Sequence, residues 1–252
     1  MLSVPHDQGL SSQDEQTTNT GVTMHLNSLI KISILGFALS TFTGCAKDPS
    51  KDVASAKVEE VKPAEPKAAP AADTEKAAPE AQAVQAGNLG GELLFTGSKV
   101  TGAHTCKFTD WSGDYTAGKT IEEGQLSVTV KTTAMACDFD DPKPWTVKLE
   151  KHLRSDDFFA SEKFPEATFA STSIKAQADT ATQATHLVTG KMTIRGIEKE
   201  ISFPAKLSSD EAGFKAGIEF SLNRKDFEMS YAGKADDLIR DGVVLKLTLA
   251  AK

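Results

Sequence analysis

Hydrophobic and polar residues alternate with a period of two in run after run between residues 93 and 249. This alternation is typical of β-strands that bury one face, because successive side chains of a strand point to opposite sides. The runs lie at 93–100, 102–109, 126–130, 167–173, 188–194, 201–207, 214–222 and 243–249. The pattern therefore predicts about eight strands.

The connections between these runs are short where the pattern is clearest. The pair Arg195–Gly196 separates two runs and residues 208–213 separate the next two, and both spacings suit antiparallel hairpins. A different pattern over 147–153, followed by a turn at 155–159, predicts a short helix. A further helical turn is expected at 236–240.

Eight antiparallel strands close most naturally into a barrel, because closure removes the exposed edges of a sheet. We therefore predict an all-β fold, an eight-stranded antiparallel barrel with one or two short helices. An interior of this size is either filled by side chains or holds one small ligand. The alternation alone does not choose between these interiors, and a β-sandwich would satisfy it as well.

The composition before residue 88 is quite different. Residues 46–87 consist mainly of Ala, Pro, Glu, Lys and Asp, with five prolines and no aromatic residue. Such a segment cannot bury enough apolar surface to offset the entropy of ordering it. We therefore predict a disordered, extended tether over 46–87 and a barrel domain over 88–252.

The first 45 residues resemble a targeting segment. Residues 1–23 are polar and without periodicity. They are either disordered or the result of a start codon assigned upstream of the true one, which would then be Met24. Residues 24–45 then supply one basic residue, Lys31, and the apolar run 32–39. That run is too short to span a bilayer, which takes about 20 residues. We therefore predict a signal peptide over 24–45.

The end of this segment, Phe42–Cys45, resembles a bacterial lipobox, with Phe42 where Leu is usual. The resemblance implies that Cys45 carries the acyl chains of a membrane anchor. Ala46 follows it, and similarity to enterobacterial sorting implies the outer rather than the inner membrane. The expected location is thus the cell envelope, facing the periplasm. An uncleaved signal anchor and an ordinary secreted protein are the alternatives.

The charge balance narrows the choice of partners. The formal net charge is −7, from 28 basic and 35 acidic residues. A nucleic-acid-binding domain would carry a basic stripe, and attraction to anionic lipids would require a polybasic cluster. The composition therefore argues against both kinds of partner.

Two cysteines, Cys106 and Cys137, lie within the predicted barrel. In an oxidising exported compartment they are expected to form a disulfide that holds the loop over 138–144 to the barrel. Two separate buried thiols are one alternative. A metal site built from His104 and Cys106, which share a strand face, is another.

Several segments resemble the YceI-like family, in the order in which that family has them. They are 97–104, 152–159, 164–169, 188–196, 203–204 and 223–227, and they span nearly all of residues 90–250. Glu228 departs from the pattern, which usually has Gly there, and Cys106 and Cys137 are not part of it. The resemblance implies a lipocalin-like barrel, exported to the periplasm, that binds a polyisoprenoid or similar amphiphile in an apolar channel. Dimerisation of family members makes a homodimer one state that the resemblance allows, and nothing in the sequence tests it.

The candidate ligand residues follow from the barrel and the resemblance together. His152 and Arg154 flank the predicted helix and are candidates for binding a polar head group, with ordinary exposed ion pairs as the alternative. The candidate channel residues are otherwise apolar apart from one histidine, and a dry, filled core is their alternative. They are Phe95, His104, Phe108, Val128, Phe169, Val188, Met192, Phe203, Ile218, Phe220, Phe227 and Leu245.

The sequence contains no nucleophile elbow, no HExxH motif and no phosphate-binding glycine loop. We therefore expect no catalytic residues, no metal and no cofactor apart from a bound lipid. The expected function is a non-catalytic carrier, store or sensor of a long-chain lipid, anchored to a membrane through Cys45. The alternatives are a structural or interaction lipoprotein with a filled barrel, and a quinone-linked redox auxiliary.

Overall fold

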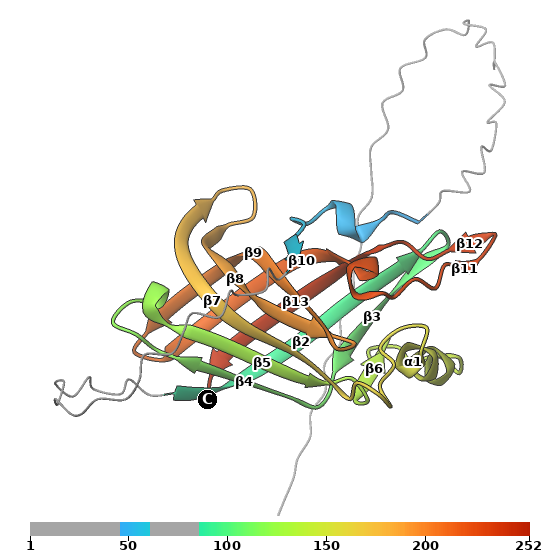
Figure 1. The fold of residues 1–252 in the computed structure, drawn as a ribbon, viewed down its shortest axis with the longest axis horizontal. Helices are drawn as coiled ribbons and strands as arrows, with labels where there is room; N and C mark the ends of the chain where they lie inside the picture. Colours follow the sequence, from blue (N-terminus) through green and yellow to red (C-terminus); the bar gives the residue numbers. More distant parts are fainter. Residues whose placement is uncertain (1–45, 61–85) are drawn as a thin grey trace, which may run out of the picture. The chain divides into compact units, whose positions relative to one another are not determined.

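The computed structural model describes residues 46–60 and 86–252 (Figure 1). The predictions for residues 1–23 and 24–45, including acylation of Cys45, lie outside the described residues. Within the described part of the chain, none of the helices is long and apolar enough to cross a membrane.

Eight antiparallel strands close into a barrel, which confirms the predicted fold class (Figure 1). The ring runs β13, β10, β9, β8, β7, β5, β4, β2, and the pairing of β13 with β2 closes it. The strands are β2 (Ala86–Lys99), β4 (Trp111–Thr116), β5 (Gln125–Lys131), β7 (Glu166–Asp179), β8 (Ala184–Ile194), β9 (Ile197–Asp210), β10 (Gly213–Asn223) and β13 (Gly242–Ala251).

Two short strands extend the ring at one end. β3 (Gly102–Phe108) continues the hairpin with β2, and β6 (Met135–Cys137) pairs with β3. The sequence pattern did not indicate β4 (Trp111–Thr116), because Gly113 takes the place of an apolar side chain at an inward position of this short strand. β4 nevertheless carries the ring from β5 to β2.

The alternation in the sequence becomes an inward and an outward face. In β10 every second residue from Phe214 to Phe220 is buried, and Phe203 of the neighbouring strand β9 stacks on Phe220 with ring centroids 4.3 Å apart. β8 and β9 are joined by the predicted tight turn, in which Arg195 and Gly196 both have positive φ. Two consecutive positive φ angles match the right-handed twist of the flanking strands.

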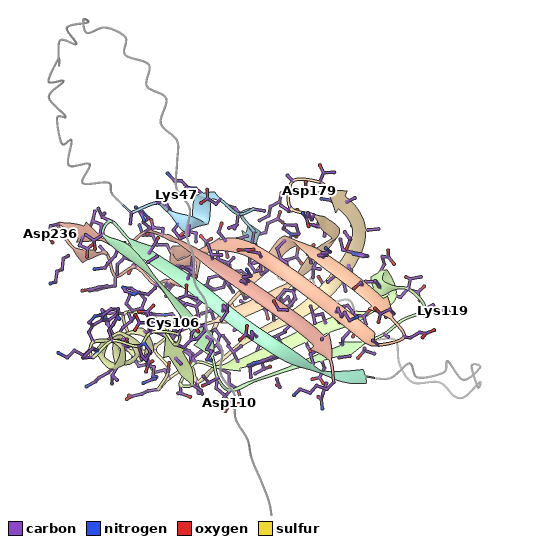
Figure 2. All side chains as sticks on the ribbon, turned by 180° about the vertical axis from the view of Figure 1, so that it is seen from behind. Lys47, Cys106, Asp110, Lys119, Asp179 and Asp236 are labelled. Carbon is purple, nitrogen blue, oxygen red and sulfur yellow. A yellow bond between two sulfur atoms is a disulfide. The ribbon has the colours of Figure 1, made fainter. Side chains whose placement is uncertain are left out.

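The two ends of the barrel differ. One end carries α1 (Thr146–Arg154), η3 (Arg224–Phe227), β11 (Gly233–Lys234) and β12 (Asp237–Leu238), and we call it the α1 end. The other carries η2 (Ile121–Glu123) and the turns at 180–183 and 211–212, and we call it the η2 end. Figure 2 shows Lys47 and Asp236 at the α1 end, and Lys119 and Asp179 at the η2 end.

The helix over 147–153 was predicted correctly, since α1 spans Thr146–Arg154. The helical turn predicted at 236–240 was wrong, because this segment contains β12 and an isolated bridge instead. Val100 donates a backbone hydrogen bond to the carbonyl oxygen of Leu238, and Ile239 bridges to Lys99. Residues 237–239 thus pair with the turn between β2 and β3, and the local sequence at 236–240 does not show that these hydrogen-bond partners are available.

The η2 end is closed by aromatic packing. Tyr115 stacks on Phe214 with ring centroids 3.7 Å apart, and its hydroxyl donates to the carbonyl oxygen of Ile121 at 3.4 Å. Burial raises the pKa of Tyr115, and the nearby carboxylate of Glu122 raises it further. The phenol is therefore neutral at physiological pH and can be buried with Phe214 in the packing that closes the η2 end.

The predicted tether over 46–87 requires a correction. Residues 46–60, which we call the strap, pack on the barrel through η1 (Pro49–Lys51) and β1 (Lys57–Glu60). β10 pairs with β9 only as far as Ile218 and Ala205, so the two strands part toward the α1 end. β1 pairs with β9 in that slot, while the backbones of Ala54 and Ala56 bond to Ser221 of β10. An open sheet edge orders a segment whose composition indicates disorder; residues 61–85 lie outside the described residues.

Arg240 fixes the start of the strap at the α1 end. Its guanidinium donates to the carbonyl oxygens of Ala46 and Lys47, and it lies 3.8 Å from the carboxylate of Asp48. The backbone N–H of Ala46 donates to the carbonyl oxygen of Val100 at 3.0 Å. The residue that follows Cys45 is therefore held beside the turn between β2 and β3.

Substitution of Gly242 by valine is expected to displace the strap. A Cβ built on Gly242 would lie 2.2 Å from the Oγ of Ser50, so a side chain there and η1 cannot occupy the same space. We expect hydrogen exchange in residues 48–56 to become about tenfold faster, which corresponds to about 1.4 kcal/mol. The control is Gly217→Val in β10, where the nearest atom to a built Cβ is 4.0 Å away. Equal exchange in both variants would contradict the packing described.

The strap is also expected to loosen in acid. Partial burial raises the pKa of Asp48, but hydrogen bonds from the Ser50 hydroxyl and amide and the charge of Arg240 outweigh this and leave the pKa below its usual value of 3.8. A lowered carboxylate pKa stabilises the folded strap above pH 3.8, and this contribution is lost as pH falls through the folded pKa. NMR titration of strap amides should show this step in the wild type and not in Asp48→Asn.

Candidate functional site

The barrel contains a cavity whose interior offers about 170 Å³ of free space. At about 10–15 Å³ of such space per water, it has room for on the order of ten water molecules. Ten waters occupy about 300 Å³ of liquid, which lies at the lower limit of ligand pockets. The barrel interior is therefore partly open.

The lining of the cavity is almost entirely apolar. It consists of the inward residues of the strands together with side chains from α1 and from the loops at the α1 end. The only exceptions are Gly97, Thr168, Arg224 and Arg240. The apolar members are Leu93, Leu94, Phe95, Phe108, Leu126, Val128, Val130, Leu153, Phe158, Phe159, Ala167, Phe169, Met192, Ile194, Phe203, Ile218, Phe220, Leu222, Phe227, Met229, Ile239, Val243, Leu245 and Leu247.

The cavity reaches the α1 end of the barrel and stops short of the η2 end. Leu153, Ile239 and Arg240 line it and are partly exposed, which places them at its mouth. Tyr115 and Phe214, which close the η2 end, are buried and do not contribute to the lining. The mouth of the cavity therefore lies beside α1 and β12.

The two arginines at the mouth are already bound by the protein. Arg224 is buried, donates to the carbonyl oxygens of Met229, Ile239 and Arg240, and pairs with the carboxylate of Asp241 at 3.0 Å. Arg240 is bound to the strap. Because buried charges are stable only when paired, these contacts make both guanidiniums structural parts of the mouth. They leave the cavity without a free cationic group to recognise an anionic ligand.

Ten of the twelve predicted channel residues line the cavity, and two do not. Val188 is fully buried in the hydrophobic core and does not line the cavity. His104 lies on β3, where its Nδ1 pairs with the carboxylate of Asp138 at 3.0 Å and its ring packs edge-on against Trp145 at 5.0 Å. The loop after β6 covers that part of β3, so His104 contacts the loop and not the interior.

The two candidate head-group residues have other partners. His152 pairs through Nε2 with the carboxylate of Asp157 at 2.8 Å and packs against Phe158 and Tyr231. Arg154 donates to Glu150 at 3.5 Å. Neither lines the cavity, whereas Leu153 between them does, because the helical rotation between successive residues turns only Leu153 toward the barrel.

The barrel and its cavity have counterparts among known proteins. A family model described as the YceI-like domain matches residues 76–251, which is more than two-thirds of the chain. The chain belongs to the YceI-like family.

Curated relatives agree with this assignment. The UPF0312 protein of Photorhabdus laumondii is 32% identical over 127 residues, which are 48% of this chain and 60% of that protein. Protein YceI of Escherichia coli O157:H7 is 32% identical over 131 residues, covering 48% of this chain and 61% of that protein. The chain thus spans about three-fifths of the length of these YceI-like relatives.

A solved structure supports the fold. The crystal structure of BcnA from Burkholderia cenocepacia superposes with a TM-score of 0.53 at 20% identity, covering 64% of this chain and 96% of that one. This likeness concerns the barrel fold alone.

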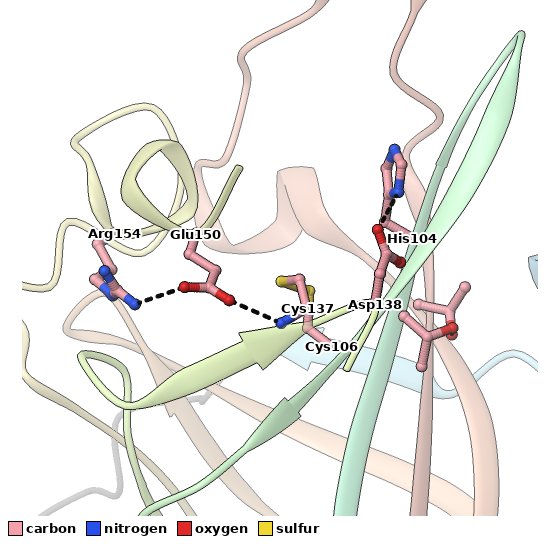
Figure 3. The surroundings of a disulfide bond; sticks show 8 residues. His104, Cys106, Cys137, Asp138, Glu150 and Arg154 are labelled. Atoms are coloured by element: carbon pink, nitrogen blue, oxygen red, sulfur yellow. Dashed lines mark hydrogen bonds and ion pairs between the residues drawn. A yellow bond between two sulfur atoms is a disulfide. The ribbon is translucent and has the colours of Figure 1, made fainter. Parts of the chain in front are cut away.

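The YceI-like barrel of this chain carries a disulfide between Cys106 and Cys137, which confirms the predicted pair (Figure 3). The two residues lie directly opposite each other in β3 and β6, and both are buried. The backbone N–H of Cys137 donates to Glu150 of α1 at 3.1 Å, and Glu150 in turn accepts from Arg154. Because Cys106 is bonded to Cys137, the alternative metal site with His104 does not form.

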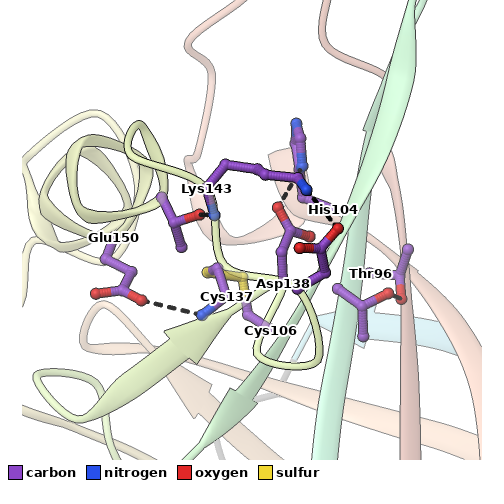
Figure 4. Close-up of polar contacts among 10 residues, drawn as sticks. Thr96, His104, Cys106, Cys137, Asp138, Lys143 and Glu150 are labelled. Atoms are coloured by element: carbon purple, nitrogen blue, oxygen red, sulfur yellow. Dashed lines mark hydrogen bonds and ion pairs between the residues drawn. A yellow bond between two sulfur atoms is a disulfide. The ribbon is translucent and has the colours of Figure 1, made fainter.

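The loop predicted to be held by the disulfide is fixed by further contacts (Figure 4). Asp138 follows Cys137 with a φ of 45°, and its N–H donates to the carbonyl oxygen of Thr105 at 2.8 Å. Lys143 pairs with Asp141, and its N–H donates to the Oγ1 of Thr146 at 3.0 Å. The disulfide and these bonds seat α1 at the mouth of the YceI-like barrel.

Sequence reasoning missed the residues that form the mouth. Phe158 and Phe159, Met229 and Ile239 all line the cavity but come from loops, where no periodicity marks an inward face. The aromatic pair Phe158–Phe159 was the one available signal, because two adjacent aromatic residues in a short loop seldom face water together. Arg195 holds this loop by donating to the carbonyl oxygens of Asp156 and Phe158.

Proposed function

We propose that this YceI-like barrel binds one long-chain apolar molecule, with its chain in the cavity and its polar end at the α1 end. The observation that carries the proposal is the cavity itself, with 24 apolar side chains among 28 lining residues. Water in such a space lacks hydrogen-bond partners, and empty apolar cavities take up hydrocarbon guests instead. Each buried methylene contributes about 0.8 kcal/mol to binding.

The chemistry of the lining also sets the selectivity that we propose. Arg224 and Arg240 are occupied by protein carbonyls and carboxylates, and His152 is paired with Asp157. With no unpaired charged group among the residues that line the cavity, affinity should follow the length and branching of the chain more than its head group. The methyl branches of an isoprenoid suit an irregular wall of Phe, Leu and Met side chains, which agrees with the family resemblance.

We propose a non-catalytic role, as a carrier, store or sensor. The binding energy comes from an apolar lining that presents no nucleophile or general base to a ligand. The lipobox resemblance of Phe42–Cys45 supports export and acylation at Cys45, which would hold the barrel at a membrane that supplies its ligand. A mass measurement of the N-terminal peptide tests acylation, because an unmodified thiol or an intact signal peptide would refute it.

Binding is tested by titration with a fluorescent long-chain fatty acid, followed by displacement. A polyprenol, a fatty alcohol and a fatty acid of matched chain length should displace the probe with similar midpoints. Shorter chains should need higher concentrations, by roughly fourfold for each methylene removed. Failure of every chain to bind would refute the proposal, and strong preference for one head group at equal length would refute its selectivity.

A further inference from the structure

The exposed large hydrophobic side chains gather at one end of the barrel. Among residues 46–60 and 86–252 the large hydrophobic side chains that are more than a third exposed are Trp145 at 44%, Val147 at 71%, Tyr231 at 37% and Leu238 at 48%. Trp145 and Val147 begin α1, Tyr231 follows η3, and Leu238 is in β12. All four therefore lie at the α1 end, on the elements that surround the mouth of the cavity.

Independent contacts hold these residues on one surface. Trp145 packs on His104 of β3, and the N–H of Val100 bonds to the carbonyl oxygen of Leu238. Tyr231 packs on His152 of α1 with centroids 4.9 Å apart. These contacts join three of the four residues to β3, to α1 and to the turn between β2 and β3, and Val147 lies in the first turn of α1, two residues after Trp145.

The strap leads the chain to the same surface. Ala46 is bonded to Val100 and Arg240, and Cys45 is the residue before it in the sequence. One residue spans at most about 3.6 Å, so the position of Ala46 fixes where the proposed anchor leaves the barrel. The strap removes most of the reach that a free tether over 46–87 would have given.

We propose that the α1 end is a membrane-docking surface, on which Trp145, Val147, Tyr231 and Leu238 enter the interface of a lipid bilayer. Tryptophan and tyrosine are the side chains that favour this interface, because they combine an apolar ring with a polar group. The mouth of the cavity then faces the bilayer, and a long-chain ligand passes between membrane and barrel without crossing water. The acylation of Cys45 belongs to the proposed function, but the docking surface rests on these exposed side chains as well.

The charges around this surface indicate the kind of membrane. Lys143 pairs with Asp141, Lys99 with Asp237, and His152 with Asp157. Lys148, Lys151 and Lys234 are exposed at the same end and take part in none of the ion pairs of the described residues, so docking should combine apolar insertion with attraction to anionic lipid. Vesicles of phosphatidylcholine should suffice for insertion of the apolar side chains, and 0.5 M salt, which screens charges beyond about 5 Å, should weaken only the additional binding to anionic lipid.

The test uses the full-length chain with vesicles of phosphatidylcholine whose acyl chains are brominated, because bromine quenches tryptophan on contact. Trp111→Phe leaves Trp145 as the only tryptophan. The matched reporter carries Trp111→Phe, Trp145→Phe and Ala181→Trp, which places the tryptophan in an exposed turn at the η2 end. We expect quenching of Trp145 to be about fivefold stronger, because docked side chains lie about 5–10 Å into the interface.

Variants separate the surface from the anchor and from the ligand. Val147→Asp and Leu238→Asp should each reduce the quenching of Trp145, whereas Ala178→Asp, at an exposed position of β7, should not. The mass of the Cys45 peptide reports acylation separately. A chain acylated at Cys45 whose Trp145 is not quenched would overturn the docking surface, and so would an unacylated chain without quenching. A dimer that Val147→Asp splits, with Trp145 unquenched, would assign the surface to a second copy and equally overturn the proposal.

Discussion

Replacing Gly97 with leucine is expected to weaken the binding of long-chain ligands by about a hundredfold while the barrel stays folded. Gly97 lines the cavity beside Phe95 on β2, and a Cβ built on it has no other heavy atom within 4 Å. A leucine side chain therefore extends into empty space and occupies the volume of about four carbon atoms of the ligand. At about 0.8 kcal/mol each, these carbons account for about 3 kcal/mol of binding.

The matched control is Gly217→Leu. Gly217 lies between two buried residues of β10 and so faces outward, and a Cβ there has similar freedom. Both variants should retain the far-ultraviolet circular dichroism and the unfolding midpoint of the wild type to within a few degrees. Titration with the fluorescent fatty acid should then separate them. If Gly97→Leu binds as well as Gly217→Leu, the ligand does not occupy the cavity.

Removal of the disulfide is expected to lower the free energy of unfolding by about 3 to 4 kcal/mol, because the bond closes a loop of some thirty residues in the unfolded chain. The separation between Cys106 and Cys137 is 31 residues, and both are buried. The double variant Cys106→Ala, Cys137→Ala avoids placing polar groups in the core. Its melting temperature should fall by about 10 °C, as measured by chemical and thermal denaturation.

Reduction of the wild-type protein provides the control for this variant. Treatment with dithiothreitol should produce the same loss of stability in the wild type and no change in the double variant. A double variant whose unfolding free energy lies within about 1 kcal/mol of the oxidised wild type would show that the pairing of β3 with β6 holds without the bond. In that case the disulfide would contribute little to seating α1.

The strands were predictable because their signal is local. Burial of one face forces a period of two, and β10 keeps that period from Phe214 to Phe220. Nine of the ten candidate channel residues that line the cavity lie on inward strand faces as this period predicts, and Phe227 lies in η3. Val188 was misplaced because the pattern shows that a side chain points inward but not whether a neighbour fills the space in front of it. His104 was misplaced because a covering loop gives the inner face of β3 different surroundings.

The strap and the mouth were not predictable from local sequence. Residues 46–60 read as a polar tether, and they are ordered only because β9 and β10 part and leave backbone groups to pair with. The β-structure at 237–239 likewise depends on the turn between β2 and β3. Both are tertiary effects of segments more than a hundred residues apart in sequence. They bear on the proposed function, because the strap would fix the position of the proposed anchor at Cys45 and the loops form the mouth of the cavity.

The central claim, that the barrel holds a long-chain lipid, is tested most directly by native mass spectrometry of the full-length protein purified from the cells that produce it, followed by organic extraction. We predict a second species, heavier by the mass of one lipid, and an extract that contains a long isoprenoid or acyl chain in equimolar amount. The same measurement on Gly97→Leu should show the ligand-free mass alone. A wild-type protein that is free of ligand and takes up neither added polyprenol nor fatty acid would contradict the account.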